Sequence, residues 1–185
     1  TIGGLGLTGV IVKVKVKLKK VSSSNMLQKC IRFESLQEFF DLSAAYDDKY
    51  EYTVSWIDCL SGKNARGHFM VADHADDGIL KIGDKFKLNF PLQSPVSLVN
   101  KLTLKPFNTL YYNKQRVKEV NVIVGYDPFF YPLDGILNWN RMYGKKGFQQ
   151  YQCVVDYENG YDAIHNILKA IKSADTGSFL AVLKV

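Results

Sequence analysis

A chain of 185 residues with 46% hydrophobic and 23% charged residues has the composition of an ordinary globular domain, which excludes intrinsic disorder. No apolar stretch approaches the ~20 residues that a membrane-spanning helix needs, so we expect a soluble protein or one that sits peripherally on a membrane. The formal net charge of +6 raises the question of an anionic partner, and the answer depends on where the charges lie.

Both ends of the chain look like cuts through the interior of a larger protein. Thr1 opens a glycine-rich loop without an initiator Met, a charged n-region or an apolar signal core. Lys184 stands one residue from the last position, at the end of a predicted strand. We therefore expect a longer protein on either side.

Much of the positive charge lies in one alternating segment near the N-terminus. Its lysines, at positions 13, 15, 17, 19 and 20, alternate with Val12, Val14, Val16 and Leu18. A period of two predicts a strand with the valines facing inward and the lysines outward. The lysines then form either a solvated face that discourages edge pairing or a surface that attracts a phosphate or an anionic membrane.

The next elements are predicted in the order strand, helix, strand. Residues 26–33 form an apolar strand. Ser35 and Glu38 have the S-x-x-E spacing of a capping box and begin a helix that ends near Asp47. Residues 50–57, rich in aromatic and β-branched side chains, form the second strand.

The middle of the chain is less regular. We expect strands over 66–72, 85–90 and 117–124, and a helix from Val96 that is interrupted at Pro106. Residues 127–132 form a rigid aromatic turn. Because such a turn is costly to expose, we expect it to pack against another part of the protein.

The strand, helix, strand order returns near the C-terminus. Residues 148–155 predict a strand, 161–172 a helix that stops before Gly177, and 178–184 a closing strand. The sequence therefore predicts an α+β fold, with a mostly antiparallel sheet built from two β-α-β units and both helices on one face.

No familiar catalytic or metal-binding pattern is found. Cys30, Cys59 and Cys153 are far apart and have no histidine at ligand spacing, which favours free core thiols in a reducing compartment. His68, His74 and His165 are equally scattered. The chain has no H-E-x-x-H, G-x-S-x-G or Walker motif, and we assign it no catalytic residue.

Two segments have residue types that suit ligand binding. The loop Gly3-Gly4-Leu5-Gly6-Leu7-Thr8-Gly9 precedes a predicted strand, so it is not a Rossmann fingerprint, but bare glycine backbone still permits close approach of a cofactor. Gln150 and Gln152 would point to the same face of a strand, where their amides suit the hydroxyls of a sugar. A tight structural turn and an exposed polar face are the simpler alternatives.

These two segments also carry a resemblance to a known family. The glycine loop with Val10-Ile11 resembles the last flavin-contacting segment of the vanillyl-alcohol-oxidase-type flavoproteins. Four further groups of residues resemble the decaprenylphosphoryl-β-D-ribose oxidase branch of that family: Tyr131 to Asp134, Trp139 to Gly144, Gly147 to Gln152, and Ser178 to Lys184.

The resemblance implies residues 1–12 as the end of an FAD-binding domain and 13–185 as a truncated substrate-binding domain. FAD would lie along Gly4, Gly6, Thr8, Gly9 and Ile11. A sugar or sugar-lipid substrate would lie near Trp56, Phe130, Gln150, Gln152 and Lys184. We expect Asp134 to pair with Arg141 and fix the aromatic turn beside a buried Trp139.

In that family, FAD oxidises a secondary hydroxyl of a polyprenylphosphoryl ribose to a ketone, and a separate reductase completes an epimerisation. Flavin-binding segments of the family have no counterpart here, so the resemblance implies that this chain alone neither retains FAD nor catalyses the reaction. The family has Tyr-His before Pro-Leu-Asp where this chain has Phe130-Tyr131. That departure leaves open a sugar or sugar-lactone oxidase acting on a soluble substrate.

An alternative of another class is a basic module that binds an anionic lipid surface through the lysine segment. Nucleic acid is not an expected partner, because lysines and aromatic residues are not interleaved on one surface.

Overall fold

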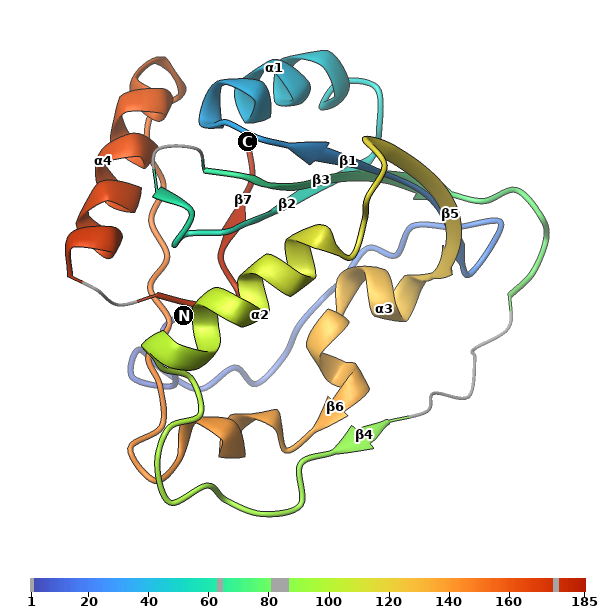
Figure 1. The fold of residues 1–185 in the computed structure, drawn as a ribbon. Coiled ribbons are helices and arrows are strands. Elements are labelled where there is room, and N and C mark those ends of the chain that lie inside the picture. Colours follow the sequence, from blue (N-terminus) through green and yellow to red (C-terminus); the bar gives the residue numbers. More distant parts are fainter. Residues whose placement is uncertain (1, 63–64, 81–86, 175–176) are drawn as a thin grey trace.

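A computed structural model of the chain describes residues 2–62, 65–80, 87–174 and 177–185 (Figure 1). In chain order, its helices and strands are β1 (Asn25–Phe33), α1 (Leu36–Tyr46), β2 (Tyr52–Ile57), β3 (Gly67–His74), β4 (Leu88–Asn89), α2 (Lys101–Asn113), β5 (Glu119–Gly125), α3 (Tyr126–Phe130), β6 (Ile136–Leu137), α4 (Gly160–Ser173) and β7 (Val182–Leu183). Short 3₁₀ helices cover Pro132–Gly135, Trp139–Tyr143 and Tyr157–Asn159.

Five strands form the main sheet, in the order β5-β1-β3-β2-β7. Every neighbouring pair in it is antiparallel. In this register Ile31 lies opposite Phe69 and Trp56 opposite His68, so the two pairs point to opposite faces of the sheet. β4 and β6 form a separate parallel pair.

Helices α1 and α4 cover one face of this sheet. The core there contains Ile31, Phe33, Leu36, Phe39, Ile57, Ala65, Phe69 and Val71, with Ile164 and Leu168 of α4 packed against it. As predicted, Ser35 caps α1 and accepts a hydrogen bond from the Glu38 N–H at 3.1 Å. The Glu38 carboxylate reaches one residue further back than in the usual capping box, to the N–H of Glu34 at 2.7 Å.

Helix α2 covers the opposite face of the sheet and runs through Pro106. The predicted break at this proline is therefore wrong. Asn100 and Thr103 form a complete capping box at the start of the helix. The helix then continues past the one backbone hydrogen bond that Pro106 cannot donate, because Leu104, Asn108 and Tyr112 are buried at helical spacing.

The lysine-rich segment near the N-terminus does not form the predicted strand. Residues 9–21 have no regular secondary structure, and Val12 and Leu18 are 94% and 85% exposed. The prediction that these apolar side chains face inward is therefore wrong. Alternation defines two faces only when a neighbouring strand supplies hydrogen bonds, and none of the described strands pairs with this segment.

The predicted α+β class with a mostly antiparallel sheet is confirmed, and the two predicted helices do lie on one face. The second β-α-β unit is incomplete. Residues 148–155 form no strand, and the predicted strand over 178–184 shrinks to the two residues of β7. None of the described strands pairs with the first of these segments, so its backbone gains no ladder of hydrogen bonds.

The aromatic turn packs against the sheet, as expected. Phe130 meets the ring of Tyr52 edge-on at 4.9 Å, and Phe129 lies 6.3 Å from the same ring. The strand predicted over 85–90 lies partly outside the described residues, and within the described part only Leu88–Asn89 form a strand, β4. Among the described helices none has the length and apolar character needed to cross a bilayer.

Candidate functional site

Two aromatic side chains of the sheet meet helix α2 on its inner side. Trp56 of β2 and His68 of β3 are paired across the strands and point away from the α1 core. The Trp56 ring lies 4.7 Å from that of Tyr111, edge to face, and 5.7 Å from that of His68. Trp56 is 4% exposed, so it forms the buried end of the site.

From Tyr111 the ring contacts continue outward to the C-terminal segment. Phe107 stacks on Tyr111 at 6.1 Å, since the two stand four residues apart on α2. Phe179 then lies 5.8 Å from Phe107 and 6.0 Å from Tyr143.

The outer end of the series is formed by residues 139–148. Tyr143 stacks on Phe148 at 4.4 Å, and Trp139 lies 5.1 Å from Phe148. The rings form one continuous group, which we call the aromatic row: Trp56, Tyr111, Phe107, Phe179, Tyr143, Phe148 and Trp139. Phe107 and Phe148 are 46% and 45% exposed, so the row gives part of its ring surface to solvent. Such surface suits the apolar face of a ligand.

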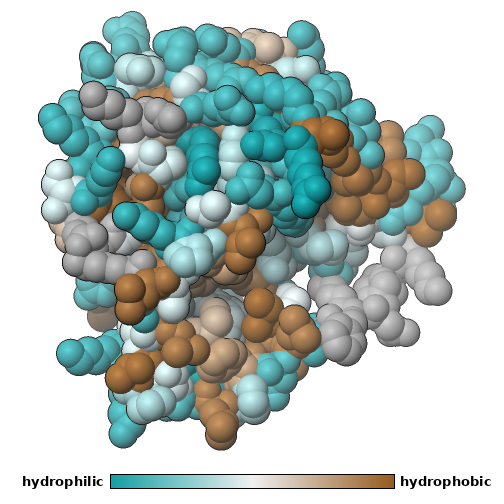
Figure 2. Space-filling view, in the orientation of Figure 1, coloured by the Kyte–Doolittle hydropathy of each residue, from teal (hydrophilic) through white to brown (hydrophobic). Residues whose placement is uncertain are grey.

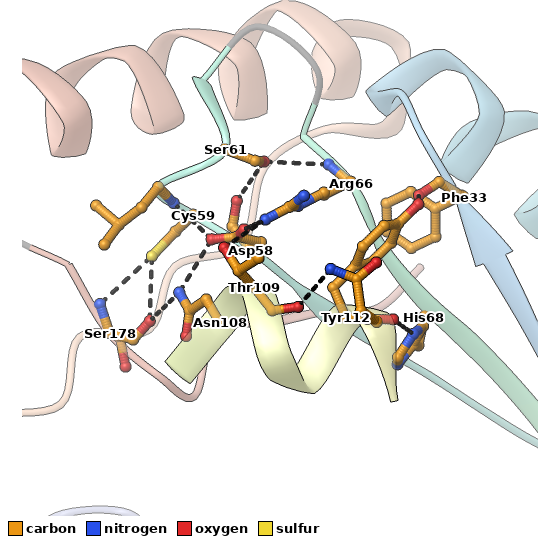
Figure 3. A network of polar contacts seen from close by, with 12 residues as sticks. Phe33, Asp58, Cys59, Ser61, Arg66, His68, Asn108, Thr109, Tyr112 and Ser178 are labelled. Carbon is orange, nitrogen blue, oxygen red and sulfur yellow. Dashed lines mark hydrogen bonds and ion pairs between the residues drawn. The ribbon is translucent and has the colours of Figure 1, made fainter. Parts of the chain in front are cut away.

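A polar network holds the C-terminal segment against α2 (Figure 3). Asp58, 3% exposed, accepts a hydrogen bond from Arg66 Nε at 3.0 Å and one from Asn108 Nδ2 at 3.0 Å. The same Asn108 amide donates to the carbonyl of Ser178 at 3.2 Å, and the Ser178 N–H donates to Cys59 Sγ at 3.3 Å. Residue 178 is thus fixed from two sides.

Trp56 adds a third constraint on this segment. Its indole Nε1 donates to the carbonyl of Phe179 at 2.9 Å. Because the bond joins the buried end of the aromatic row to the backbone of its middle member, the orientation of Phe179 depends on Trp56 as well as on the network of Asp58. These contacts preorganise the row before any ligand arrives.

Asn108 is fully buried, and its Oδ1 has no hydrogen-bond partner among the described residues. An unpaired buried acceptor costs roughly 1–3 kcal/mol. The amide nitrogen of the same side chain donates hydrogen bonds to both Asp58 and Ser178. The orientation that allows both bonds leaves Oδ1 without a partner in the described part of the chain, and these bonds offset its free-energy cost.

His68 and Tyr112 form another buried part of this face. Their rings stack at 5.6 Å, and His68 Nε2 lies 3.1 Å from the Tyr112 carbonyl oxygen. Arg32 and Arg66 place their guanidinium groups 4.3 and 4.7 Å from the Tyr112 ring. Burial lowers the pKa of His68 to about 4, so this imidazole is neutral near pH 7.

The aromatic row opens beside an apolar part of the surface. In the orientation of Figure 2, hydrophobic residues gather over the lower half of the molecule, around α2, β4 and β6. Exposed apolar side chains of these elements include Leu88, Leu102 and Leu137. Apolar side chains gathered in this way, among polar ones, are typical of a binding face.

The glycine loop has the open backbone that a close-lying ligand needs. Gly3 and Gly6 have φ values of +79° and +78°, and a Cβ built on either would meet nothing within 4 Å. Gly4 differs, because its hydrogen side is filled by the loop's own Thr8 side chain. Gly9 and Ile11 are exposed. FAD contact at this loop stays a prediction.

The predicted substrate residues are only partly brought together. Trp56 and Tyr52 lie on the same face of β2, about 13 Å apart along the strand. Phe130 packs on Tyr52, so it lies on the same face of the sheet as Trp56 but at the other end of the strand. Gln150, Gln152 and Lys184 are exposed. Gln150 and Gln152 follow Phe148, the outer member of the aromatic row.

Three finer expectations fail. Trp139, which we expected to be buried, is half-buried. Arg141 does not pair with Asp134. Its Nη1 instead donates to the backbone carbonyls of Phe90 and Pro91, at 3.2 and 2.7 Å. Two backbone carbonyls that are distant in the sequence but close in space thus accept from Arg141 in place of the Asp134 carboxylate. Of the three free cysteines, predicted as core thiols, only Cys59 is buried, while Cys30 is half-buried and Cys153 is exposed.

Sequence reasoning missed α2 as a part of the site. The i, i+4 spacing of Phe107 and Tyr111 was a usable signal, since it places two rings on one side of a helix. Asp58 and Arg66 gave no such signal, because only the β2–β3 hairpin brings them within 3.0 Å of each other.

Comparison with known proteins gives two informative relatives. The chain is 31% identical, over its whole length, to a decaprenylphosphoryl-beta-D-ribose oxidase from Mycolicibacterium smegmatis, and it spans 42% of that protein. It is also 30% identical, over 112 residues, to an uncharacterized protein in the mprA 5′ region of Streptomyces coelicolor. That match covers 56% of this chain and 30% of the relative. The chain therefore spans less than half the length of these relatives. No protein-family model matches it.

Proposed function

We propose that this chain is the substrate-binding part of an FAD-dependent oxidoreductase that converts a secondary hydroxyl of a sugar to a ketone. The observation that carries the proposal is the 31% identity, over all of the chain, to an oxidase of decaprenylphosphoryl-beta-D-ribose. By the same likeness, the proposed substrate is a ribose joined through a phosphate to a polyprenyl chain.

The aromatic row supports this role from the geometry of the chain itself. It connects Trp56, through other rings, to residues 139, 143 and 148, which are far from Trp56 in the sequence. In the proposed function the exposed rings of Phe107 and Phe148 receive the apolar part of the substrate. Gln150 and Gln152, just beyond Phe148, supply amide donors and acceptors for sugar hydroxyls.

The residues of the glycine loop fit a contact with FAD. Open space above Gly3 and Gly6 lets a cofactor approach the backbone without meeting a side chain. FAD, when bound, supplies the oxidising group that takes a hydride from the carbinol carbon. The part assigned to this chain is to hold the sugar, orient it and exclude water.

Two further features belong to the proposal. A lipid-linked substrate implies peripheral contact with a membrane, where exposed lysines such as Lys13 and Lys15 favour an anionic surface. The ketone product requires a reductase as a partner if the sugar is to be epimerised.

Substrate tests on the protein encoded by the complete reading frame separate the leading function from its alternative. We expect decaprenylphosphoryl ribose to bleach the flavin absorbance, and a soluble aldonolactone to leave it unchanged. Bleaching by the lactone alone would replace the lipid-sugar assignment with the soluble-sugar one.

The aromatic row is tested by two variants of neighbouring exposed side chains on α2. Phe107→Ala removes a ring of the row, and Leu110→Ala removes an apolar side chain that is 73% exposed and is not a member of the row. We expect Phe107→Ala to raise KM for the lipid sugar about tenfold, and Leu110→Ala to leave it unchanged. Equal KM values for the two variants would remove the row from the substrate site.

A further inference from the structure

A pocket lies on the opposite side of the sheet from the aromatic row, between α1, α4 and the turn after β2. Its volume is about 220 Å³. Leu36, Ala65 and Leu168 form an apolar floor, and Leu36 and Ala65 are each 2% exposed. The volume is below the ~300 Å³ of pockets that enclose a whole drug-sized ligand, so it suits one end of a longer molecule.

Three basic side chains of α4 stand along this pocket. His165, Lys169 and Lys172 follow one another at spacings of four and three residues, which places them on one stripe of the helix. The His165 ring stacks on that of Tyr161 at 6.3 Å, which orients it. None of the described lining residues is acidic, and in the described part of the chain neither lysine forms an ion pair.

The position of Lys172 depends on a bare backbone. A Cβ placed on Gly62 would lie 2.5 Å from Lys172 Nζ, so the ammonium group rests directly over this glycine. Gly62 also has a φ of +75°, which a side chain would strain. The turn after β2 therefore brings the lysine to the mouth of the pocket.

We propose that this pocket binds a phosphate ester that carries a hydrocarbon group, with the phosphate at Lys169 and Lys172 and the hydrocarbon on Leu36, Ala65 and Leu168. Two ammonium groups that form no ion pair with the described residues attract an anion, and the apolar floor favours an attached alkyl group over a free ion. The pocket lies on the other face of the sheet from the aromatic row, and its proposed ligand does not depend on the proposed oxidase function.

Calorimetric titration of the purified chain with octyl phosphate, inorganic phosphate and octyl glucoside tests this site. We expect octyl phosphate to bind at one site, and the other two probes to bind at least about tenfold more weakly, because each lacks one half of the recognition. Inorganic phosphate of equal affinity would reduce the site to a simple anion site. Octyl glucoside of equal affinity would reduce it to an apolar one.

Paired variants assign the binding to α4. K169Q/K172Q should weaken the binding of octyl phosphate at least about tenfold, and K145Q/K146Q, with the same change of net charge, should leave the affinity unchanged. Both lysines of each pair are exposed, so neither variant removes core packing. Unchanged affinity in K169Q/K172Q, or an equal loss in both variants, would overturn the proposal.

Discussion

The two faces of the five-stranded sheet are stabilised in different ways. Beneath α1 and α4 the sheet buries an apolar core centred on Phe33, Phe69 and Val71. Beneath α2 it buries Trp56, His68 and the carboxylate of Asp58, whose polar atoms are tied to the backbone and to Arg66 and Asn108. The stability of the first face depends on the volume and shape of its apolar side chains. The stability of the second depends on matched donors, acceptors and charges.

This difference indicates that the two faces have different roles. A polar interior fixes orientation at the cost of desolvation, which is worthwhile where side chains must be held for a ligand. The α2 face holds Phe179 and Trp56 in this way, and the α1 face provides the rigid support behind them.

The largest expected effect is on the apolar face. Phe69→Ala should lower the free energy of unfolding by about 4 kcal/mol, because it leaves a cavity beside Phe39 and Tyr46. Urea denaturation measures this loss. Phe107→Ala, at a ring that is 46% exposed, should cost about 1 kcal/mol, and equal losses would contradict the contrast between buried and open rings.

A loss of about 3 kcal/mol is expected for Asp58→Asn on the polar face. The change keeps the volume but removes the charge that faces Arg66, and it sets a second amide against Asn108 Nδ2. The matched change Asp134→Asn alters an exposed side chain and should cost less than about 0.5 kcal/mol. If Asp58→Asn were equally mild, the network would not hold the C-terminal segment.

His68 should make stability depend on pH. The pKa of this histidine is near 4 in the folded chain and 6.5 in its ordinary state, so below pH 6.5 the unfolded chain binds a proton that the folded chain does not. Stability from this group is fully present above about pH 6.5 and declines as pH falls towards 4, by roughly 3 kcal/mol in all.

Unfolding measured between pH 4 and 7 tests this dependence. Substitution His68→Phe, which cannot titrate, should flatten the decline, and His165→Gln should keep it. An unchanged slope in His68→Phe would mean that other groups carry the acid sensitivity.

The smallest effect is expected in the lysine segment, which belongs to neither face. K13Q/K15Q/K17Q should change stability by less than about 0.5 kcal/mol, because these side chains are exposed. Lys29→Gln removes a partly buried partner of Glu119, 3.0 Å away, and should cost up to about 1 kcal/mol. A larger loss in the triple variant would show that residues 9–21 pack against the domain.

Elements with a local signal could be predicted from the sequence. The capping residue Ser35 gave the start of α1, and the apolar spacing of Ile164, Leu168 and Ile171 gave α4. Strands β1, β2, β3 and β5 each have enough apolar or β-branched residues to be predicted within a few positions. Gln150 and Gln152 were assigned to a strand on alternation alone, and that strand is not formed.

What the sequence determined by itself was therefore the α+β class, the ends of α1 and α4 and the side chains available for binding, since these depend on contacts within a few residues. Tertiary structure decided that the alternating lysine segment stays unpaired, that α2 passes through Pro106, and that Arg141 binds carbonyls and not Asp134. It also assembled the aromatic row from four distant segments. Hydrogen bonds and ring contacts over such separations depend on how strands and helices pack, and no local pattern encodes that arrangement.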